Sequence, residues 1–372
     1  MSRAEAARSI VVVGGGQAAL AVGYFLARLR RDAAQGRRAS AAEFELLESR
    51  PEGGGSWADM WPSLRLFSPS DFSSLPGMRM PQSREQTASA PEVVDYLRSY
   101  AECYELPVSY GEEVSQVSLT GDGAFQVDAS GGSRRADAVV MATGTWGRPF
   151  VPSVTGADGF GGRQLHSREY AGPDEFQGMR VGVVGGGNSG AQIAADLQPS
   201  AQVTWVTRRK PRFLPDDVGG RELFAAATQQ VEGRGRGVAD LGDIVALPPV
   251  RAARDRGLRA RWDLHSLTHA GARWNDGAVT PLDAVIWCTG FRPDLAPLRS
   301  LDLDRTAGAP RTRSDLATAS ANLPGLYFVG YGDWCGPASA TLVGVGRVAR
   351  ATVADIGSSG GGARSNERAV TR

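Results

Sequence analysis

The sequence has little cysteine and little histidine. Among 372 residues there are three of each, and Cys103, Cys288 and Cys335 form no CxxC pair and have no histidine at ligand spacing. A disulfide framework, a zinc site or a redox-active dithiol would need such pairs. The sequence therefore predicts three reduced structural cysteines and no metal site.

Long apolar runs and an excess of charge of one sign are also missing. No apolar run reaches the ~18 residues of a membrane-spanning helix, and the first apolar stretch is too short for a signal-peptide core. Lys+Arg 41 against Asp+Glu 40 leaves a net charge of +1, so no field of the whole chain would attract nucleic acid or an anionic membrane. We expect a cytoplasmic protein with no nucleic-acid partner and no membrane insertion.

Glycine is the residue in excess. It supplies 48 of 372 positions, roughly twice its average usage, which indicates tight turns or close approaches of the backbone to ligands. Two glycine runs stand in matching contexts. A buried strand over 9–13 is expected to lead into Gly14-Gly15-Gly16 and a helix to about Arg31, and a strand over 180–184 into Gly185-Gly186-Gly187 and a helix over 191–197.

Two further strands close these units in the same way. Apolar strands are expected over 137–144 and 283–290, and they end in Thr143-Gly144 and Thr289-Gly290. A final strand over 326–329 precedes a helix expected over 337–356, and we assign this strand to the first sheet. The pattern predicts an α/β fold with two dinucleotide-binding (Rossmann-type) domains.

The glycine runs have the spacing that a bound nucleotide requires. A dinucleotide pyrophosphate can sit at a helix N-terminus only where backbone N–H groups reach it, and a further small residue is needed where the helix meets the strand. The matching residues are Gly14, Gly16 and Ala19 in the first unit and Gly185, Gly187 and Gly190 in the second. One copy alone would be read as an ordinary glycine-rich turn, but two copies in matched context predict two nucleotide sites.

The residue that ends the second strand of each unit indicates which nucleotide binds. Glu48 ends a strand expected over 44–48 and is placed to accept both ribose hydroxyls of FAD or NAD. It lies further from Gly14 than the usual ~20 residues, so a loop insertion is expected over 30–42. After the strand over 202–206 stand Arg208 and Arg209 with no acid, which favours the 2′-phosphate of NADPH; a solvated basic turn is the alternative.

The segment from Phe160 to Tyr170 carries a longer motif. Its sequence FGGRQLHSREY resembles the FxGxxxHxxx(Y/F/W) fingerprint of class B flavin-dependent monooxygenases. Other segments are most similar to the YUCCA-type monooxygenases and to bacterial flavoproteins of arsenic-resistance and metal-efflux operons: 54–57, 64–69, 142–144, 187–190 and 288–291. The resemblance runs from about Ile10 to Ile356.

This resemblance implies an FAD-binding domain interrupted by an NADPH-binding domain. The expected boundaries are 1–172 and 293–356 for the FAD domain, 173–292 for the NADPH domain and 357–372 for a disordered tail. It also implies roles for single residues. Those expected to bind FAD are Gly14, Gly16, Ala19 and Glu48, with Gly55 and Trp57 at the flavin entrance, Thr143 and Gly144 in the ATG motif, and Asp333 near the ribityl or pyrophosphate.

The same resemblance extends the second site. The residues expected to bind NADPH are Gly185, Gly187, Asn188, Ser189, Gly190, Arg208, Arg209, Thr289 and Gly290. Pro337 is expected to open the last helix, whose positive end would face the flavin pyrimidine ring. Trp57 could instead be core packing, and Asp333 a helix-entry residue.

The histidines and one departure from the family need separate interpretation. His166 is the fingerprint histidine, and both a proton-donor role and a hinge or hydrogen-bonding role are open for it. His265 and His269 are four apart, but their surroundings favour a strand and a turn over a metal pair. Animal-type relatives carry an asparagine beside the flavin where this chain has Leu66-Phe67-Ser68, so the role of that asparagine does not carry over.

The sequence thus predicts an FAD-dependent, NADPH-oxidising monooxygenase. One oxygen atom of O₂ would enter a small-molecule substrate through a flavin C4a-(hydro)peroxide, with the protein supplying orientation and a dry pocket. One alternative is an NADPH-dependent reductase that passes electrons to another acceptor. The other is a non-catalytic flavoprotein redox sensor associated with metal or arsenic resistance. A homodimer is the assembly considered.

Overall fold

The computed structural model describes residues 8–37, 42–85, 87–216 and 244–358. Internal contacts divide the chain into two compact units. Unit 1 consists of the described residues within 1–52, 100–143 and 295–372, and unit 2 of the described residues within 53–99 and 144–294. Within the described ranges, no helix is long and apolar enough to cross a membrane.

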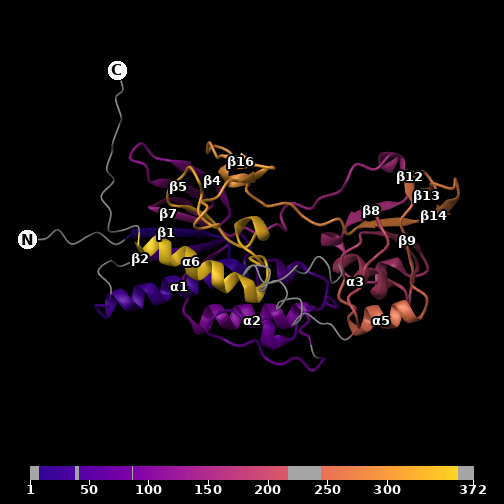
Figure 1. Cartoon of the computed structure of the whole chain (residues 1–372), viewed down its shortest axis with the longest axis horizontal. Coiled ribbons are helices and arrows are strands. Elements are labelled where there is room, and N and C mark those ends of the chain that lie inside the picture. Colours follow the sequence, from indigo (N-terminus) through magenta and orange to yellow (C-terminus); the bar gives the residue numbers. More distant parts are fainter. Residues whose placement is uncertain (1–7, 38–41, 86, 217–243, 359–372) are drawn as a thin grey trace, which may run out of the picture. The chain divides into compact units, whose positions relative to one another are not determined.

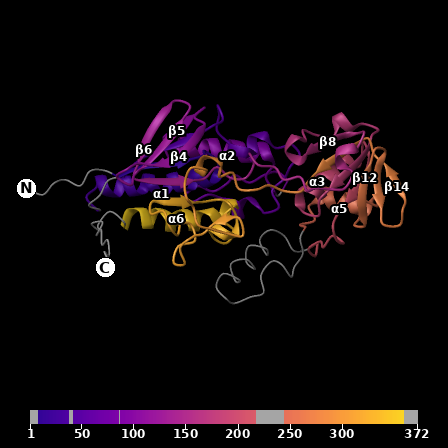
Figure 2. The ribbon, with the colours of Figure 1, turned by 90° about the horizontal axis from the view of Figure 1, so that it is seen from above.

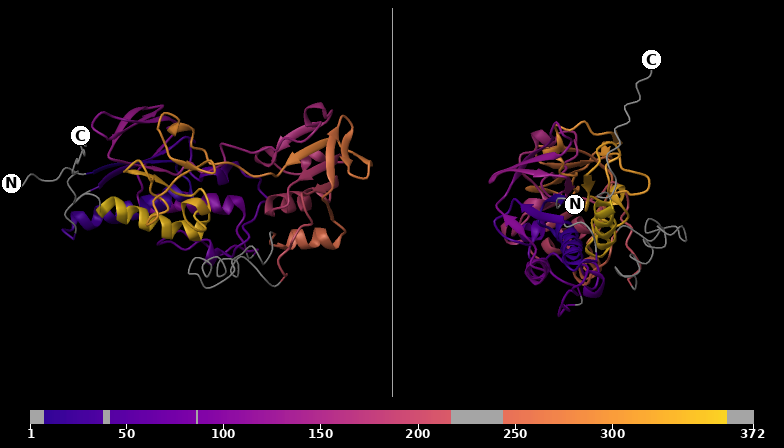
Figure 3. Two further views of the ribbon diagram at one scale, coloured as in Figure 1. Left: turned by 45° about the horizontal axis from the view of Figure 1, so that its top comes forward. Right: turned by 90° about the vertical axis from the view of Figure 1, so that its left-hand side faces the viewer.

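Unit 1 is built on a five-stranded parallel sheet. Its spatial order is β18 (Leu326–Phe328), β7 (Ala138–Met141), β1 (Arg8–Val13), β2 (Ala42–Glu48) and β3 (Val108–Tyr110). Helix α1 (Gln17–Ala34) follows β1 and packs beside the last helix, α6 (Leu342–Ser358), as the indigo and yellow helices of Figures 1, 2 and 3 show. The expectation that the strand after residue 325 joins the first sheet is confirmed, because β18 pairs with β7.

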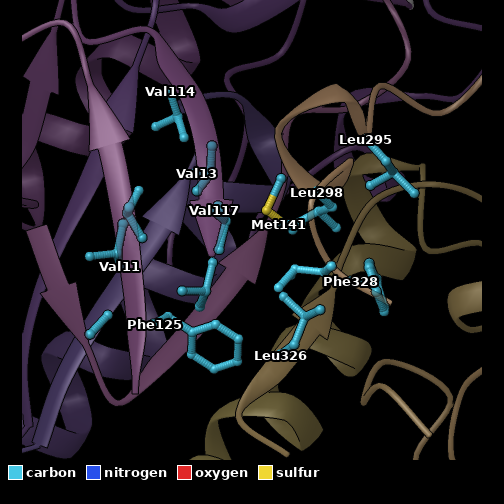
Figure 4. Packing of buried hydrophobic residues seen from close by; sticks show 14 of the residues in the cluster. Val11, Val13, Val114, Val117, Phe125, Met141, Leu295, Leu298, Leu326 and Phe328 are labelled. Carbon is cyan, nitrogen blue, oxygen red and sulfur yellow. The ribbon is translucent and has the colours of Figure 1, made fainter. Parts of the chain in front are cut away.

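A second, antiparallel sheet of unit 1 covers part of the first. It contains β4 (Val114–Leu119), β5 (Phe125–Ala129) and β6 (Gly132–Ala136). Figure 4 shows the core between them, which contains Val11 and Met141 of the parallel sheet and Val117 and Phe125 of the antiparallel sheet. Burial of such side chains stabilises the fold by about 1.5–3 kcal/mol each. This core joins three separate stretches of the chain into one unit.

Unit 2 repeats the parallel architecture. Its sheet has the order β11 (Ala260–Arg261), β10 (Gln202–Val206), β9 (Arg180–Val184), β15 (Ala284–Trp287) and β8 (Arg163–His166). Helices α3 (Asn188–Leu197) and α5 (Pro248–Asp255) pack on each other. In both units the strand before the glycine turn lies between the second strand and the strand that leads into Thr-Gly. The expected α/β fold with two dinucleotide-binding units is confirmed.

The remaining elements lie outside these sheets. They are the antiparallel sheet β12 (Leu264–Thr268), β13 (Gly271–Trp274) and β14 (Val279–Pro281), the hairpin β16 (Arg305–Thr306) and β17 (Ala309–Pro310), and helix α2 (Ala90–Cys103). Single-turn helices are η1 (Gly55–Asp59), η2 (Ser70–Phe72), η3 (Ala157–Gly159), η4 (Ser167–Glu169), η5 (Asp174–Phe176), η7 (Ala296–Leu298) and η8 (Asp333–Cys335). His265 lies in β12 and His269 in the turn after it, as the strand-and-turn interpretation predicted.

The start of the last helix was predicted wrongly. Helix α6 begins at Leu342 and not at Pro337, because Ala338 has a left-handed φ of +55° that no right-handed α-helix accommodates. The N–H of Gly344 donates to Oγ1 of Thr341 at 3.0 Å, so Thr341 caps the helix. The positive end of α6 therefore lies further along the chain than Pro337.

Other boundaries differ by a few residues. Helix α3 begins at Asn188 and not at 191, and α1 continues to Ala34, so the expected loop over 30–42 was wrong at its start. The helix extends because Leu29 is still buried on its inner face and because most of the residues that follow, arginines and alanines, are good helix formers. Helix α6 runs to Ser358, past the expected start of the tail, and residues 359–372 lie outside the described residues.

Residues 53–99 group with unit 2, whereas the sequence placed them in the FAD domain; the expected domain boundaries stay a prediction.

Candidate dinucleotide-binding sites

The first glycine turn connects β1 to α1 through close backbone contacts. The N–H of Gly14 donates to the carbonyl of Leu47 at 2.7 Å. Gly14 has a φ of +120°, and a Cβ there would lie 2.5 Å from the carbonyl oxygen of Ala142. Gly16 caps α1 without a side-chain hydrogen bond, and no acid stands in the first turn. The N–H groups at the start of α1 are therefore suited to an anion.

Glu48 is held directly against this turn. It is 3% exposed, and its Oε2 accepts the N–H of Gly15 at 2.6 Å while Oε1 accepts the N–H of Arg50 at 2.9 Å. A Cβ on Gly15 would lie 2.6 Å from the Cβ of Glu48. Oε1 also lies 3.4 Å from the Ser49 hydroxyl and 3.4 Å from Nη1 of Arg50, so Oε2 is the oxygen better placed to accept a ribose hydroxyl. A side chain on Gly14 or Gly15 would clash at this turn, and a fixed carboxylate lies beside it. This arrangement fits an adenine dinucleotide.

The other residues expected at the first site are spread along unit 1. Ala19 is fully buried in α1. The N–H of Thr143 donates to Oη of Tyr331 at 3.1 Å, and its Oγ1 lies 2.6 Å from the same oxygen. Asp333 is exposed at the start of η8, and its Oδ1 accepts the N–H of Ala338 at 3.3 Å. Ala338 lies before α6, so this bond closes the loop after η8 and is not an N-cap bond of the last helix. The contact of Asp333 with the cofactor stays a prediction.

Three of the expected FAD residues fall in unit 2. Gly55 is buried and Trp57 half-buried in η1, and a Cβ on the preceding Gly54 would lie 2.9 Å from Cγ1 of Val94. Gly144 directly follows Thr143, and a Cβ on it would meet no atom within 4 Å. Tight packing accounts for the glycine before η1. The roles of Gly55, Trp57 and Gly144 at the flavin stay predictions.

The second glycine turn connects β9 to α3. A Cβ on Gly185 would lie 2.2 Å from the carbonyl oxygen of Cys288, and a Cβ on Gly190 would lie 2.4 Å from the carbonyl oxygen of Gly185. Gly187 caps α3 without a side-chain hydrogen bond, and the first turn carries no acid. The first and last glycines are thus required by close packing of strand and helix, and the N–H groups at the start of α3 can receive a second pyrophosphate.

At the end of β10, a threonine stands where the first unit has Glu48. Thr207 is 5% exposed, and its Oγ1 donates to the carbonyl of Arg209 at 2.8 Å. A Cβ on Gly186 would lie 3.6 Å from the Cβ of Thr207, so Thr207 holds the place that Glu48 holds in unit 1. Arg208, Arg209 and Lys210 follow it and are exposed. Arg208, Arg209 and Lys210 place positive charge at this strand end, which suits a phosphate.

Three of the remaining residues expected at the second site form hydrogen bonds with backbone groups: Asn188, Thr289 and Gly290. Oδ1 of Asn188 accepts the N–H of Val245 at 2.9 Å, while Ser189 beside it is exposed. Oγ1 of Thr289 donates to the carbonyl of Phe150. The carbonyl of Gly290 accepts the N–H of Phe150 at 2.9 Å. Their contacts with a coenzyme stay predictions.

His166 uses both ring nitrogens within unit 2. Its Nδ1 accepts the N–H of Arg168 at 3.1 Å, and Nε2 lies 3.0 Å from the carbonyl oxygen of Gly290. Because a carbonyl can only accept, Nε2 carries the proton and the ring is neutral. Burial lowers the pKa of His166, which is 3% exposed. The geometry favours the hydrogen-bonding role over the proton-donor role.

Sequence reasoning missed a pair of stacked aromatic rings. Trp146 and Phe291 have ring centroids 5.0 Å apart, and Phe291 meets His166 edge-on at 4.8 Å. The buried Nε1–H of Trp146 has no hydrogen-bond partner among the described residues. The signal was available, because each aromatic residue follows a Thr-Gly motif: Trp146 two residues after Gly144 and Phe291 directly after Gly290.

The two glycine turns, each at the carboxyl edge of a parallel sheet, define a protein with two dinucleotide-binding units. Residues 11–219 match the sequence profile of the family described as Pyridine nucleotide-disulphide oxidoreductase. This range is more than half of the chain, and the chain belongs to that family.

Individual relatives narrow the class. A flavin-containing monooxygenase from Stenotrophomonas maltophilia is 41% identical, with 95% of this chain and 99% of that chain covered and a TM-score of 0.84. The uncharacterized oxidoreductase CzcO-like of Geobacillus kaustophilus is 28% identical over 93% of this chain and 97% of its own length. The indole-3-pyruvate monooxygenase YUCCA1 of Oryza sativa is 26% identical, with 77% of each chain covered. The resemblance to class B flavin-dependent monooxygenases is confirmed: the chain is a flavoprotein oxidoreductase of this class, and FAD and a pyridine nucleotide are its cofactors.

Proposed function

We propose that this enzyme oxidises NADPH on bound FAD and inserts one oxygen atom of O₂ into a small-molecule substrate. The observation that carries the choice of coenzyme is the difference between the two turns. Glu48 accepts the Gly15 N–H beside the first turn, whereas Thr207 and the exposed Arg208 and Arg209 stand beside the second. A carboxylate suits free ribose hydroxyls, and two guanidinium groups suit a 2′-phosphate.

The residues of unit 1 would hold FAD. Gly14 and Gly16 leave room for the pyrophosphate at the start of α1, and Glu48 would accept the adenosine ribose hydroxyls. The bound flavin would supply the hydride acceptor and the chemistry with O₂. The protein's own contribution is to position and shield the reacting groups.

The residues of unit 2 would hold NADPH. Gly185, Gly187 and the start of α3 would receive its pyrophosphate, and Arg208 and Arg209 its 2′-phosphate. His166 would hold the Gly290 carbonyl in place rather than transfer a proton. The nesting of 173–292 as the NADPH domain between 1–172 and 293–356 is part of this proposal, as are a cytoplasmic location and a homodimer.

The test follows both the electrons and the oxygen. Purified protein loaded with FAD is given NADPH in air with a panel of thioethers, amines, ketones, 2-oxo acids and trivalent arsenicals, and ¹⁸O₂ incorporation is measured by mass spectrometry. A product that carries one ¹⁸O atom per NADPH oxidised supports the proposal. NADPH oxidation that depends on an added electron acceptor and labels no product would indicate a reductase. Flavin that binds but turns over almost no NADPH would indicate a sensor.

A further inference from the structure

One face of helix α3 carries three polar residues at helical spacing. Asn188, Gln192 and Asp196 are four residues apart, so their side chains lie along the same side of the helix. Each of them is hydrogen-bonded to a residue outside α3. The helix begins at the second glycine turn, so this face leads away from the candidate coenzyme site.

Gln192 binds the backbone of Arg65 at two points. Its Oε1 accepts the Arg65 N–H at 3.1 Å, and its Nε2 donates to the Arg65 carbonyl at 3.2 Å. The two bonds together fix both the position and the direction of the chain at this residue. Arg65 is thereby attached to the middle of α3.

Asp196 holds the same segment one turn further along. Its Oδ2 accepts the hydroxyl of Ser63 at 2.9 Å and that of Tyr170 at 2.8 Å. Tyr170 is 2% exposed, and burial raises its pKa, so the phenol keeps the proton that it donates. The ring of Trp61 meets that of Tyr170 edge-on, with centroids 5.8 Å apart. The fingerprint tyrosine thus serves to hold residues 61–63 on α3.

The third point of attachment lies at the coenzyme end of the helix. Oδ1 of Asn188, the first residue of α3, accepts the N–H of Val245. Val245 belongs to a small buried cluster with Leu214 and Leu247, and Phe67 packs against this cluster. Residues 61–67 are therefore connected to all three polar residues of this face: directly to Gln192 and Asp196, and to Asn188 through the cluster that contains Val245.

We propose that the Asn188–Gln192–Asp196 face of α3 couples coenzyme binding at the second glycine turn to the placement of residues 61–67, with Gln192 and Asp196 as positioning residues. The inference rests on the proposed coenzyme site. A pyrophosphate at the N-terminus of α3 stabilises the helix on which all three contacts depend, so residues 61–67 become better fixed when the coenzyme is bound. By the same linkage, a well-fixed segment favours coenzyme binding.

Hydrogen exchange on the full-length, FAD-loaded protein tests this coupling, with NADP⁺ as the probe. In the wild type, saturating NADP⁺ should slow exchange in peptides covering 61–67 by about 5-fold or more, the lower end of typical coupling. In Gln192→Ala that slowing should be lost, while the Kd for NADP⁺ from calorimetry rises by no more than the same factor. Tyr170→Phe, which leaves the Ser63 bond to Asp196 intact, should lose part of the slowing.

Gln198→Ala is the matched control. Gln198 follows the last residue of α3, and its amide bonds the Ala253 carbonyl at 3.3 Å and the Arg256 side chain at 3.1 Å, away from residues 61–67. This variant should keep the full slowing. If NADP⁺ binds the wild type but exchange at 61–67 does not change, or if Gln192→Ala keeps the slowing, the coupling is overturned while the proposed function stands. If NADP⁺ does not bind the wild type at all, both are overturned.

Discussion

The two glycine turns share one neighbour and differ in the other. In each, the first glycine touches the carbonyl just before the Thr-Gly motif: a Cβ on Gly14 would lie 2.5 Å from the carbonyl oxygen of Ala142, and one on Gly185 would lie 2.2 Å from that of Cys288. The middle glycine faces the end of the second strand, where unit 1 has a glutamate and unit 2 a threonine. In the proposed function, the shared contact would shape a pyrophosphate site in both units. In the proposed function, the differing contact would select the nucleotide.

The largest effects should come from the shared contact. Gly14→Ala places a Cβ against the Ala142 carbonyl at a positive φ, so overpacking of about 1–3 kcal/mol adds to backbone strain of about 1–2 kcal/mol. We expect purified Gly14→Ala to lack FAD, measured as the ratio of flavin to protein absorbance. Gly185→Ala should instead keep FAD and lose NADP⁺ binding in calorimetry.

Gly36→Ala separates strain from contact. Gly36 also has a positive φ, +69°, but a Cβ on it meets no atom within 4 Å. This control should keep both ligands and lose only a little thermal stability. If Gly14→Ala binds FAD as well as Gly36→Ala does, the first turn is not the FAD site.

The next largest effect should come from the cations beside the second turn. Arg208→Ala with Arg209→Ala removes two charge-assisted contacts to a 2′-phosphate, each worth about 1.5–3 kcal/mol. The KM for NADPH should rise by about 100-fold or more, and the KM for NADH should change little, in steady-state assays of both coenzymes. Lys210→Ala is the control for general loss of positive charge. Equal losses for the two coenzymes would identify the turn as a solvated basic surface.

Thr207→Glu would make the second turn more like the first. A carboxylate in the place of the Thr207 hydroxyl repels a 2′-phosphate and can accept ribose hydroxyls, so the ratio of kcat/KM for NADPH over NADH should fall by roughly tenfold, or about 1.4 kcal/mol. Thr207→Gln has the same length without the charge and separates repulsion from loss of the Thr207 bond to the Arg209 carbonyl. Identical ratios for the two variants would argue against a phosphate at this position.

The smallest expected effect concerns acid stability, because the Thr-Gly ends are held by different side chains. Tyr331 bonds Thr143 in unit 1, whereas His166, with its pKa lowered by burial, bonds Gly290 in unit 2. A lowered folded pKa means that the contribution of His166 is complete above the unfolded value of about 6.5 and is lost as the pH falls below it. Thermal unfolding is measured between about pH 7.5 and 5.5. As the pH falls, loss of the His166 contribution should lower the free energy of unfolding by at most about 1.4 kcal/mol per pH unit.

His166→Asn is the variant that checks the source of this acid sensitivity. It removes the titrating ring, so its unfolding temperature should depend less on pH than that of the wild type. A pH dependence that is the same in both proteins would show that other groups control stability in acid.

Local patterns predicted the elements that lie next to the turns. Strands β9 and β10 have the expected bounds, since short runs rich in β-branched and aromatic residues next to glycine or turn residues specify a strand. The start of α6 could not be predicted in the same way. Pro337 is a good first helical residue, but the left-handed Ala338 and the Thr341 cap decide where the helix begins.

The residues of the candidate site also divide into those that local sequence patterns predict and those that they do not. The glycines, Glu48 and the basic residues after β10 could be found because each requirement is local to a turn or a strand end. The sequence places Trp146 and Phe291 after the two Thr-Gly motifs, but it does not show that their rings stack, because the two residues lie far apart in the chain and meet only where these segments run side by side.

By itself, the sequence determined that this protein has two dinucleotide turns, that they differ in charge, and that it belongs among flavin-dependent monooxygenases. These are properties of short segments, in which a glycine or a carboxylate acts on its immediate neighbours. Only the tertiary structure decided that His166 is neutral between two backbone groups and that Gln192 and Asp196 bind residues more than a hundred positions earlier. Such contacts depend on which surfaces the packed core brings together, and no local pattern encodes that choice.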